Sequence, residues 1–289
     1  MSAPILAISN LSAMSVRDGA PILRGVDLEV ARGETRGLVG ESGAGKSTIA
    51  KAILGILPST VSVTSGQARF EGADLLAMAA PRLRRLIGEG VALIPQDPMT
   101  ALNPGRRIEA QLTDGPRLWR GLDARAARAL ALKGLEEVQI REPERVLRSY
   151  PHELSGGMRQ RVLIAAAFAL EPKLIVADEP TTALDVTVQK QILRLIRAMQ
   201  SAYGAAVIFV THDLGVVAQI CDKVTLLFGG RVIEEGGVAQ MMEAPRHPYA
   251  QALLAACPRY DRPSAGLRPI PESVVADLRA ELAREPAAR

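Results

Sequence analysis

The sequence has few aromatic residues, few cysteines and no long apolar run. Phe, Trp and Tyr together make up 3% of the 289 residues, so the core must consist mainly of Ala, Leu, Ile and Val. Such a core favours helices packed on a parallel sheet over a β-sandwich. Two cysteines, Cys221 and Cys257, exclude a disulfide framework and a closed four-thiolate metal site. This cysteine usage indicates a reduced protein of the cytosol.

Signals for membrane insertion and secretion are also missing. The longest near-apolar stretch, residues 162–170, is much shorter than the about 18 residues that a membrane-spanning helix needs. The first residues hold no basic segment followed by an apolar one, so we expect no secretory signal. The formal net charge is only +4 and no long Lys/Arg block occurs, so we expect no nucleic-acid partner. The chain should work in the cytoplasm and reach a membrane only through another subunit.

Short apolar strands alternate with helical segments along the chain, and this order predicts an α/β fold with a mostly parallel sheet. Strands are expected at residues 36–40, 66–72, 90–95, 174–177, 206–211, 224–228 and 231–235. Helices are expected at residues 48–57, 123–138, 156–170, 188–200 and 272–285. The middle of the chain, residues 97–168, lacks strand signals and predicts a helical insertion. The tail from Pro245 onward is richer in Pro and Arg, which indicates an appendage.

Residues 40–48, Gly-Glu-Ser-Gly-Ala-Gly-Lys-Ser-Thr, match the G-x-x-x-x-G-K-[ST] pattern of a phosphate-binding loop. Glycines let successive N–H groups point inward, and the helix that follows adds positive potential at its N-terminus. Lys46 is placed to reach the β- and γ-phosphates, and the Ser47 hydroxyl to ligate Mg²⁺. An incidental glycine turn would not need the apolar strand before it and the helical run after it. The expected nucleotide contacts are Gly40, Glu41, Ser42, Gly43, Ala44, Gly45, Lys46, Ser47 and Thr48.

A second motif places two carboxylates, Asp178 and Glu179, after the apolar strand at residues 174–177. In open α/β sheets this end of a strand faces the ligand crevice. Asp178 is placed to hold Mg²⁺, and Glu179 to polarise a water that attacks the γ-phosphate. Taken alone, the pair could equally be a solvated acidic turn. Beside the phosphate loop it predicts a nucleoside triphosphatase.

Four further segments narrow this class. They are Leu-Ser-Gly-Gly-Met-Arg-Gln at residues 154–160, Gln96 after the strand that ends at Pro95, Ala-Leu-Asp at residues 183–185, and His212 at a strand end. Alone, the first would be a Ser-capped helix and His212 a structural histidine. In this order and spacing, the six motifs closely resemble the nucleotide-binding subunit of ATP-binding cassette (ABC) transporters, from about Leu11 to Tyr249.

The resemblance implies a role for each matching residue. Lys46, Glu179 and His212 would act in catalysis, and Ser47, Gln96 and Asp178 would hold Mg²⁺. Gln96 would also contact the nucleotide. The residues that would contact the ATP of a partner subunit are Ser155, Gly156, Gly157 and Asp185. The implied fold is a P-loop NTPase core with a mixed, largely parallel sheet at residues 1–96 and 169–240, a helical subdomain at 97–168 and a C-terminal extension at 241–289.

A finer resemblance points to oligopeptide, dipeptide and nickel importers. It is carried by residues 95–104, by Tyr-Pro-His-Glu-Leu at 150–154 and by His-Pro-Tyr at 247–249. Two features differ from what is found in other members of the family. No aromatic residue precedes Phe70, so Val16 or Arg17 would cover the adenine in place of a stacked ring. Some relatives bind an iron–sulfur cluster in the C-terminal region, where this chain has only Cys257, so no cluster is expected.

The function implied is ATP hydrolysis that powers import of a small solute, and peptides are the first candidate for that solute. The expected partners are a second ATP-binding subunit (identical or sister), two membrane-spanning permeases and an extracytoplasmic solute-binding protein. The expected location is the cytoplasmic face of the inner membrane. One alternative is an ATPase subunit of a soluble phosphonate-processing complex, and another is a cassette of translation or DNA repair. The sequence does not predict which solute is transported.

Overall fold

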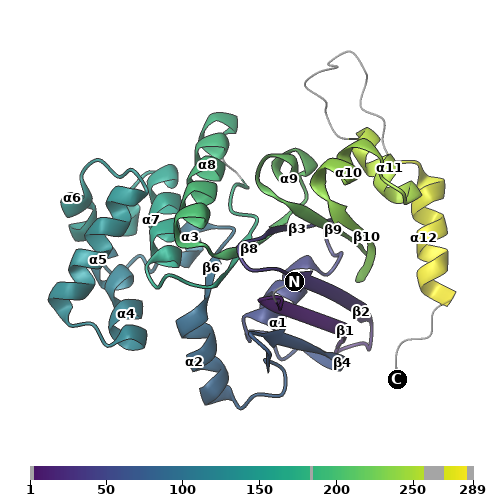
Figure 1. The fold of residues 1–289 in the computed structure, drawn as a ribbon, viewed down its shortest axis with the longest axis horizontal. Coiled ribbons are helices and arrows are strands. Elements are labelled where there is room, and N and C mark those ends of the chain that lie inside the picture. Colours follow the sequence, from purple (N-terminus) through teal and green to yellow (C-terminus); the bar gives the residue numbers. More distant parts are fainter. Residues whose placement is uncertain (1–2, 183–184, 257–269, 285–289) are drawn as a thin grey trace. The chain divides into compact units, whose positions relative to one another are not determined.

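The chain folds into two compact units (Figure 1). The computed structural model describes residues 3–182, 185–256 and 270–284. Unit 1 comprises residues 1–77 and 209–289, and unit 2 comprises residues 78–208. Every described helix is either too short or too polar to span a lipid bilayer. The domain boundaries expected from the sequence, at residues 97, 169 and 241, remain a prediction.

Unit 1 contains a four-stranded antiparallel sheet in the order β2-β1-β4-β5. Its strands are β1 (Leu6–Ser15), β2 (Pro21–Val30), β4 (Val61–Phe70) and β5 (Ala73–Asp74). Leu6 pairs with Val30 on one side and with Phe70 on the other, and all three side chains are buried. The sheet therefore has one apolar face, which forms part of the core of this unit.

The second group of strands in unit 1 carries the phosphate loop. Strand β3 (Thr35–Gly40) runs parallel to β9 (Lys223–Phe228), and β10 (Arg231–Gly237) pairs antiparallel with β9. All six residues of β3 are buried, as expected for a parallel strand covered on both faces. Helices α1 (Lys46–Ile53) and α9 (Leu214–Ile220) contact β3.

One charged side chain, Arg36, is buried within β3. Its Nε donates to Glu34 Oε1 at 2.7 Å, and its two terminal nitrogens donate to the Glu29 carbonyl at 2.7 Å and to Thr225 Oγ1 at 3.3 Å. Lys223 Nζ also lies 3.6 Å from the other Glu34 oxygen. A buried guanidinium is tolerated here because its donors are used by three different strands or their flanks.

The C-terminal residues pack against unit 1 and are not a loose appendage. They form α10 (Val238–Glu243), α11 (Pro248–Ala256) and α12 (Glu272–Arg284). Tyr249 of α11 is fully buried with its ring edge-on to Phe228 at 4.9 Å between centroids, and Leu278 and Leu282 of α12 are buried. Glu234 accepts hydrogen bonds from the Arg246 and His247 amides at 2.9 and 2.8 Å, which fixes the start of α11.

Unit 2 begins with α2 (Ala80–Gly90) and contains two parallel strands, β6 (Val91–Ile94) and β7 (Leu174–Asp178). The first residues of β8 (Ala206–Thr211) follow β7, and the Ala206 amide donates to the Lys173 carbonyl at 2.9 Å. The strand β8 crosses into unit 1 at Phe209. Helix α8 (Val186–Tyr203) connects β7 to β8 and packs on α7 (Gly156–Phe168).

Between β6 and β7 the chain is helical, as the sequence predicts, and this fully described segment contains no strand. Helices α4 (Ile108–Arg120), α5 (Ala124–Glu137) and α7 pack on one another around a core of aliphatic side chains. Shorter elements join them: α3 (Pro98–Ala101), α6 (Pro143–Arg148) and a 3₁₀ turn at Pro151–Glu153.

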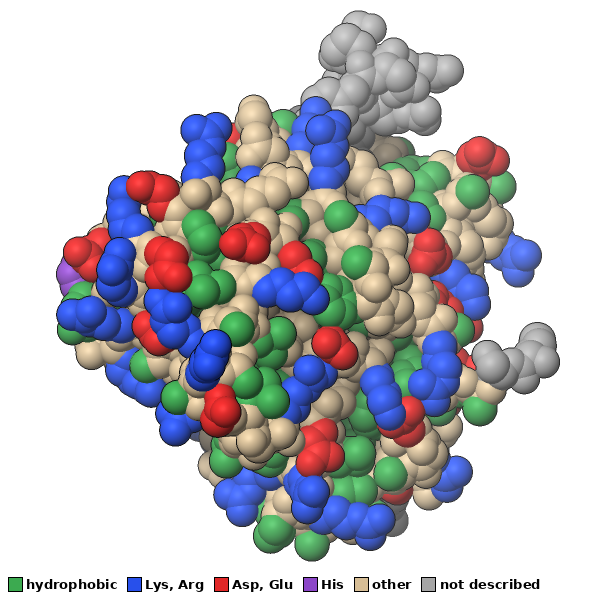
Figure 2. Space-filling model, turned by 60° about the vertical axis from the view of Figure 1, so that its left-hand side comes forward, with side chains coloured by type: hydrophobic (Ala, Val, Ile, Leu, Met, Phe, Trp, Pro, Cys, Tyr) green, Lys and Arg blue, Asp and Glu red, His purple; other side chains and the backbone are tan. Residues whose placement is uncertain are grey.

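Basic and acidic side chains are interspersed on the face of the molecule drawn in Figure 2.

Replacing Arg36 with Met should lower the free energy of unfolding by about 3 to 5 kcal/mol, because Glu34 would keep a buried carboxylate without its nearest cation. The double variant Arg36→Met/Glu34→Gln removes that charge and should recover part of the loss. Urea unfolding followed by circular dichroism measures both. As a control, Arg32→Met removes an exposed pair with Glu71 and should change stability by less than about 1 kcal/mol. Equal losses in Arg36→Met and the control would contradict this prediction.

Candidate functional site

The phosphate loop joins the C-terminal end of β3 to the first turn of α1. Gly45 is the residue before α1 and has a φ of 97°, in the left-handed region that favours glycine. A Cβ on Gly45 would also lie 2.6 Å from Leu23 Cδ2, so this position requires glycine for space as well as conformation. Glu41, Ser42, Gly43 and Ser47 are exposed, and the loop therefore presents an accessible concave backbone to an anion.

Lys46 is folded back over the loop. Its side chain is 5% exposed, and Nζ donates to the carbonyls of Gly40 at 2.7 Å and Glu41 at 2.9 Å. The ammonium group is thus held at the loop by two backbone carbonyls. Contact between this ammonium group and phosphate oxygens, which the sequence pattern predicts, stays a prediction.

In unit 2, the register of the parallel strands brings Gln96 and Glu179 together. Ile94 of β6 pairs with Ala177 of β7, and each polar residue lies two positions beyond its strand partner. Gln96 Nε2 donates to Glu179 Oε2 at 3.1 Å. Two motifs that are far apart in the sequence therefore form one polar pair at the carboxyl end of this sheet edge.

The backbone of Glu179 is in the left-handed region, with a φ of 46°. Few residues with a Cβ adopt this conformation, and it concentrates at functional positions. Thr182 holds it in place: the Thr182 amide donates to the Glu179 carbonyl at 3.1 Å, and Thr182 Oγ1 donates to Glu179 Oε2 at 3.0 Å. Thr182 was not predicted from the sequence, since no spacing rule singles out a threonine within this turn.

The donor atoms of the residues predicted to hold Mg²⁺ fit a hard cation. Ser47, Gln96 and Asp178 offer hydroxyl, amide and carboxylate oxygens, which are the ligands that Mg²⁺ prefers. Because the amide nitrogen of Gln96 donates to Glu179, its amide oxygen is the atom left for a metal. The described residues contain no cluster of three or more His, Cys, Asp or Glu side chains that could hold a metal ion.

The signature residues occupy the exposed start of α7. Ser155 is the N-cap, and its hydroxyl accepts a hydrogen bond from the Met158 amide at 3.3 Å. Gly156 faces open space, and Gly157 has only an ordinary contact with Val188. A long helix with a polar cap and two glycines at its N-terminus can bind an anion supplied from outside the chain.

The other predicted residues lie at helix starts. Asp185 caps α8 by accepting from the Thr187 and Val188 amides at 3.0 and 2.9 Å. His212 follows β8 and precedes Asp213, the N-cap of α9, so both of its neighbours in the chain are fixed by regular structure. Ala183 and Leu184 of the predicted interface loop, and Cys257, lie outside the described residues.

A buried glutamine joins the signature helix to the acidic motif. Gln160 of α7 is 1% exposed, and its Nε2 donates to the Pro180 carbonyl at 2.8 Å. Pro180 directly follows Glu179. This contact was not predicted from the sequence, although a polar residue within the otherwise apolar buried face of α7 was a signal for it.

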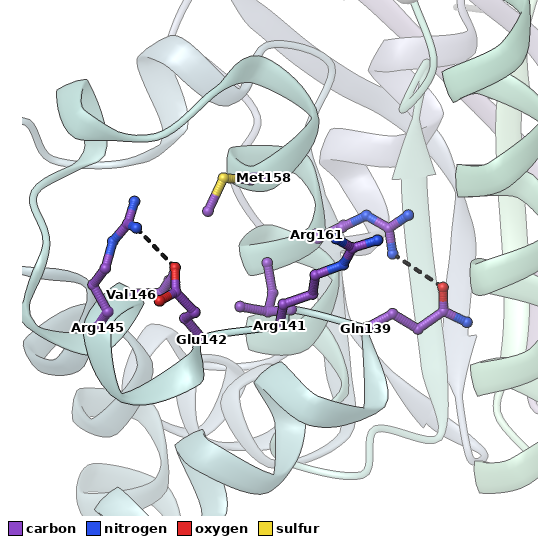
Figure 3. Close-up of a pocket in the computed structure, with 8 residues that line it drawn as sticks. Gln139, Arg141, Glu142, Arg145, Val146, Met158 and Arg161 are labelled. Carbon is purple, nitrogen blue, oxygen red and sulfur yellow. Dashed lines mark hydrogen bonds and ion pairs between the residues drawn. The ribbon is translucent and has the colours of Figure 1, made fainter.

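A cavity of about 630 Å³ lies beside α7 in unit 2 (Figure 3). Two of its three arginines have protein partners: Arg145 donates to Glu142 at 2.7 Å and Arg161 to the Gln139 side chain at 3.5 Å (Figure 3). Arg161 also donates to the Val138 carbonyl at 2.6 Å. Met158 also lines the cavity.

A phosphate loop after one parallel strand, a Gln–Glu pair after two others and a glycine-rich helix start together define an ATP-binding cassette ATPase. The chain belongs to the ABC transporter family, which it matches over residues 23–182. Residues 233–281 also match the oligopeptide/dipeptide transporter C-terminal region. The α/β fold and the ATPase class expected from the sequence are confirmed.

Curated relatives cover nearly the whole chain. The probable D,D-dipeptide transport ATP-binding protein DdpD of Escherichia coli K12 is 48% identical over 277 residues, which cover 95% of this chain and 84% of the relative. The dipeptide transport ATP-binding protein DppD of Bacillus subtilis 168 is 42% identical over 269 residues, which cover 92% of this chain and 80% of the relative.

Solved structures share the fold. CbiO1 of Clostridium perfringens, part of an ABC transporter complex, matches with a TM-score of 0.74 and 28% identity, covering 84% of this chain and 92% of that one. The ATP-binding cassette MJ0796, a dimer in a post-hydrolysis state bound to ADP and Pi, matches with a TM-score of 0.71 and 26% identity, covering 81% and 98%.

Replacing Gln160 with Leu should lower the free energy of unfolding by about 1 to 3 kcal/mol, because the Pro180 carbonyl would lose its buried donor. Chemical denaturation of the purified variant measures the loss. Gln219→Leu is a matched control: Gln219 donates only to Gly215 of its own helix at the surface, and its loss should cost less than about 0.5 kcal/mol. An unchanged midpoint in Gln160→Leu would show that the contact adds nothing to stability.

Proposed function

We propose that this chain is the ATP-hydrolysing subunit of a bacterial importer of peptides. The observation that carries the proposal is the match of residues 233–281 to the oligopeptide/dipeptide transporter C-terminal region. The names of the relatives DdpD and DppD, both dipeptide transport ATP-binding proteins, support the same substrate class. The phosphonate-processing alternative has no comparable support among them.

In the proposed reaction, the loop amides and Lys46 bind the β- and γ-phosphates of ATP, which offsets the charge that develops on the phosphoryl group. Glu179 orients the attacking water and accepts its proton. The hydrogen bonds from Gln96 and Thr182 support this role, because they fix the carboxylate in one direction. His212 binds the γ-phosphate.

Ser47, Gln96 and Asp178 would hold Mg²⁺, which when bound neutralises charge on the β- and γ-phosphate oxygens. Ser155, Gly156, Gly157 and Asp185 would contact ATP bound to a partner subunit. The exposed start of α7 supports that role, since a ligand from outside the chain could reach it. No iron–sulfur cluster is proposed.

The proposed assembly contains a second ATP-binding subunit, identical or sister, and two membrane-spanning permeases. A solute-binding protein outside the cytoplasm would deliver the peptide. The chain would sit peripherally at the cytoplasmic face of the inner membrane. The dimeric state of the structural neighbour MJ0796 supports the pairing of two cassettes. No nucleic-acid partner is proposed.

The variant Glu179→Gln should bind ATP but hydrolyse it at least about 100-fold more slowly, because the amide cannot accept the proton of the attacking water. Steady-state phosphate release and equilibrium ATP binding measure the two effects separately. Near-normal turnover would falsify Glu179 as the general base.

The same variant tests the assembly. Tagged Glu179→Gln chain is solubilised from its native host with Mg-ATP, and the proteins that copurify are identified by mass spectrometry. We expect two multi-spanning membrane proteins, with or without a second cassette. The control, Lys46→Ala in the same background, should retain less of any partner cassette because it binds phosphate poorly. Recovery of soluble enzymes alone would overturn the importer proposal.

The adenine contact gives a further prediction. Val16 is 60% exposed at the end of β1, and its amide is fixed by the Thr60 carbonyl at 2.8 Å. If Val16 covers the base, Val16→Tyr should bind ATP about five-fold more tightly, because an added aromatic ring contributes on the order of 1 kcal/mol by stacking. Titration calorimetry measures the affinity. Ile56→Tyr, also at an exposed apolar position, is the control, and equal effects in both variants would contradict the assignment.

A further inference from the structure

The turn between β9 and β10 contacts the phosphate loop. The Gly230 amide donates to the Ala44 carbonyl at 3.2 Å, and the Gly230 Cα lies 3.5 Å from the position that a Cβ on Gly45 would take. The parallel register explains this approach. Gly40, the first residue of the loop, pairs with Leu227, so the residues that follow Leu227 run alongside the loop.

This hydrogen bond orients one of the loop donors. In a trans peptide the C=O and the next N–H point in opposite directions. A hydrogen bond that holds the Ala44 carbonyl toward Gly230 therefore turns the Gly45 N–H away from Gly230. The inward orientation of such N–H groups is what makes the loop an anion-binding site.

The turn itself is closely confined. Gly229 and Gly230 have φ values of 53° and 84°, so two successive residues are in the left-handed region. The Gly230 carbonyl accepts from the Arg24 amide at 2.8 Å. A Cβ on Gly230 would overlap the Ile22 carbonyl oxygen, so strand β2 closes one side of the turn.

The C-terminal region closes another side. A Cβ on Gly229 would overlap Leu282 Cδ1, so the leucine of α12 fills the space beside the turn. Leu282 is 8% exposed, and Arg231 just after the turn pairs with Glu281 at 3.3 Å. Tyr249 of α11 packs edge-on against Phe228, the residue before the turn.

Tyr249 also reaches the neighbourhood of the loop. Its hydroxyl is buried, and the Glu41 carboxylate lies nearby. Burial raises the pKa of this hydroxyl, and the charge of the nearby Glu41 carboxylate raises the pKa further. Glu41 is the second residue of the phosphate loop, so α11 approaches the loop directly as well as through Phe228.

We infer that the C-terminal region positions the phosphate loop, with Leu282 acting through the Gly229–Gly230 turn as a positioning residue for nucleotide binding. This inference rests on the proposed function, because it requires that the phosphate loop binds ATP. It assigns a role inside the ATP site to a region that lies about 240 residues further along the chain than Gly40. Removing the side chain of Leu282 frees the turn, lets the Ala44 peptide rotate and weakens nucleotide binding.

The experiment compares Leu282→Ala with Leu278→Ala in the full chain. Leu278 is also buried on α12 but is absent from the contacts of Gly229, so it reports loss of packing alone. Hydrogen exchange of the peptide covering residues 40–47 is measured without nucleotide, and the dissociation constant of the fluorescent analogue MANT-ATP is measured with Mg²⁺. Leu282→Ala should speed exchange in this peptide and raise the dissociation constant about five-fold. Leu278→Ala should do neither, and Leu282→Met should restore both.

Equal effects of Leu282→Ala and Leu278→Ala, or no effect of either, would overturn the inference. Should Leu282→Ala fail to fold, Leu282→Val and Leu278→Val replace the pair, with smaller shifts of the same sign expected. Wild-type protein that does not bind MANT-ATP would instead overturn the proposed function. The exchange measurement needs no nucleotide, so it still decides whether Leu282 controls the loop.

Discussion

The register of parallel strands is the constraint on which the site depends. In unit 2, the pairing of Ile94 with Ala177 places Gln96 next to Glu179, because each lies two residues beyond its partner. In unit 1, the pairing of Gly40 with Leu227 places the phosphate loop beside the Gly229–Gly230 turn. A shift of one residue in either pair would send the polar side chains to the opposite face. The buried, mainly aliphatic residues of β3 and β7 make such a shift costly.

The sequence was sufficient to predict the parts of the fold that carry strong local patterns. The strand and helix around the phosphate loop, the helical insertion and the later α/β elements all form close to their expected bounds. Strands β1 and β2 were not predicted, since they contain residues typical of turns. Asn10 and Gly25 both have positive φ values within these strands, and β2 begins with proline. Pairing with neighbouring strands overrides these local preferences.

The same distinction holds for the site. The motifs predict which polar residues belong to the site. The structure then shows Lys46 held over its loop and Gln96 hydrogen-bonded to Glu179. Contacts between side chains of different helices and strands could not be predicted from the sequence. Gln160 reaches Pro180 only because α7 packs against β6 and α8, and Leu282 reaches Gly229 only because α12 lies beside the β9–β10 turn. The C-terminal tail was expected to be an appendage for this reason: its composition gives no sign of the surface on which it packs.

The two carbonyls that bind Lys46 have a consequence for the entropy of ligand binding. A free lysine side chain rotates about four bonds, and ordering it costs up to about 2 kcal/mol. Here that cost is met when the chain folds, because Nζ already bonds to Gly40 and Glu41. A phosphate that arrives at the loop encounters a cation with little conformational freedom left to lose. Preorganisation of this size corresponds to a gain in affinity of up to about 30-fold over a lysine that must be ordered by its ligand.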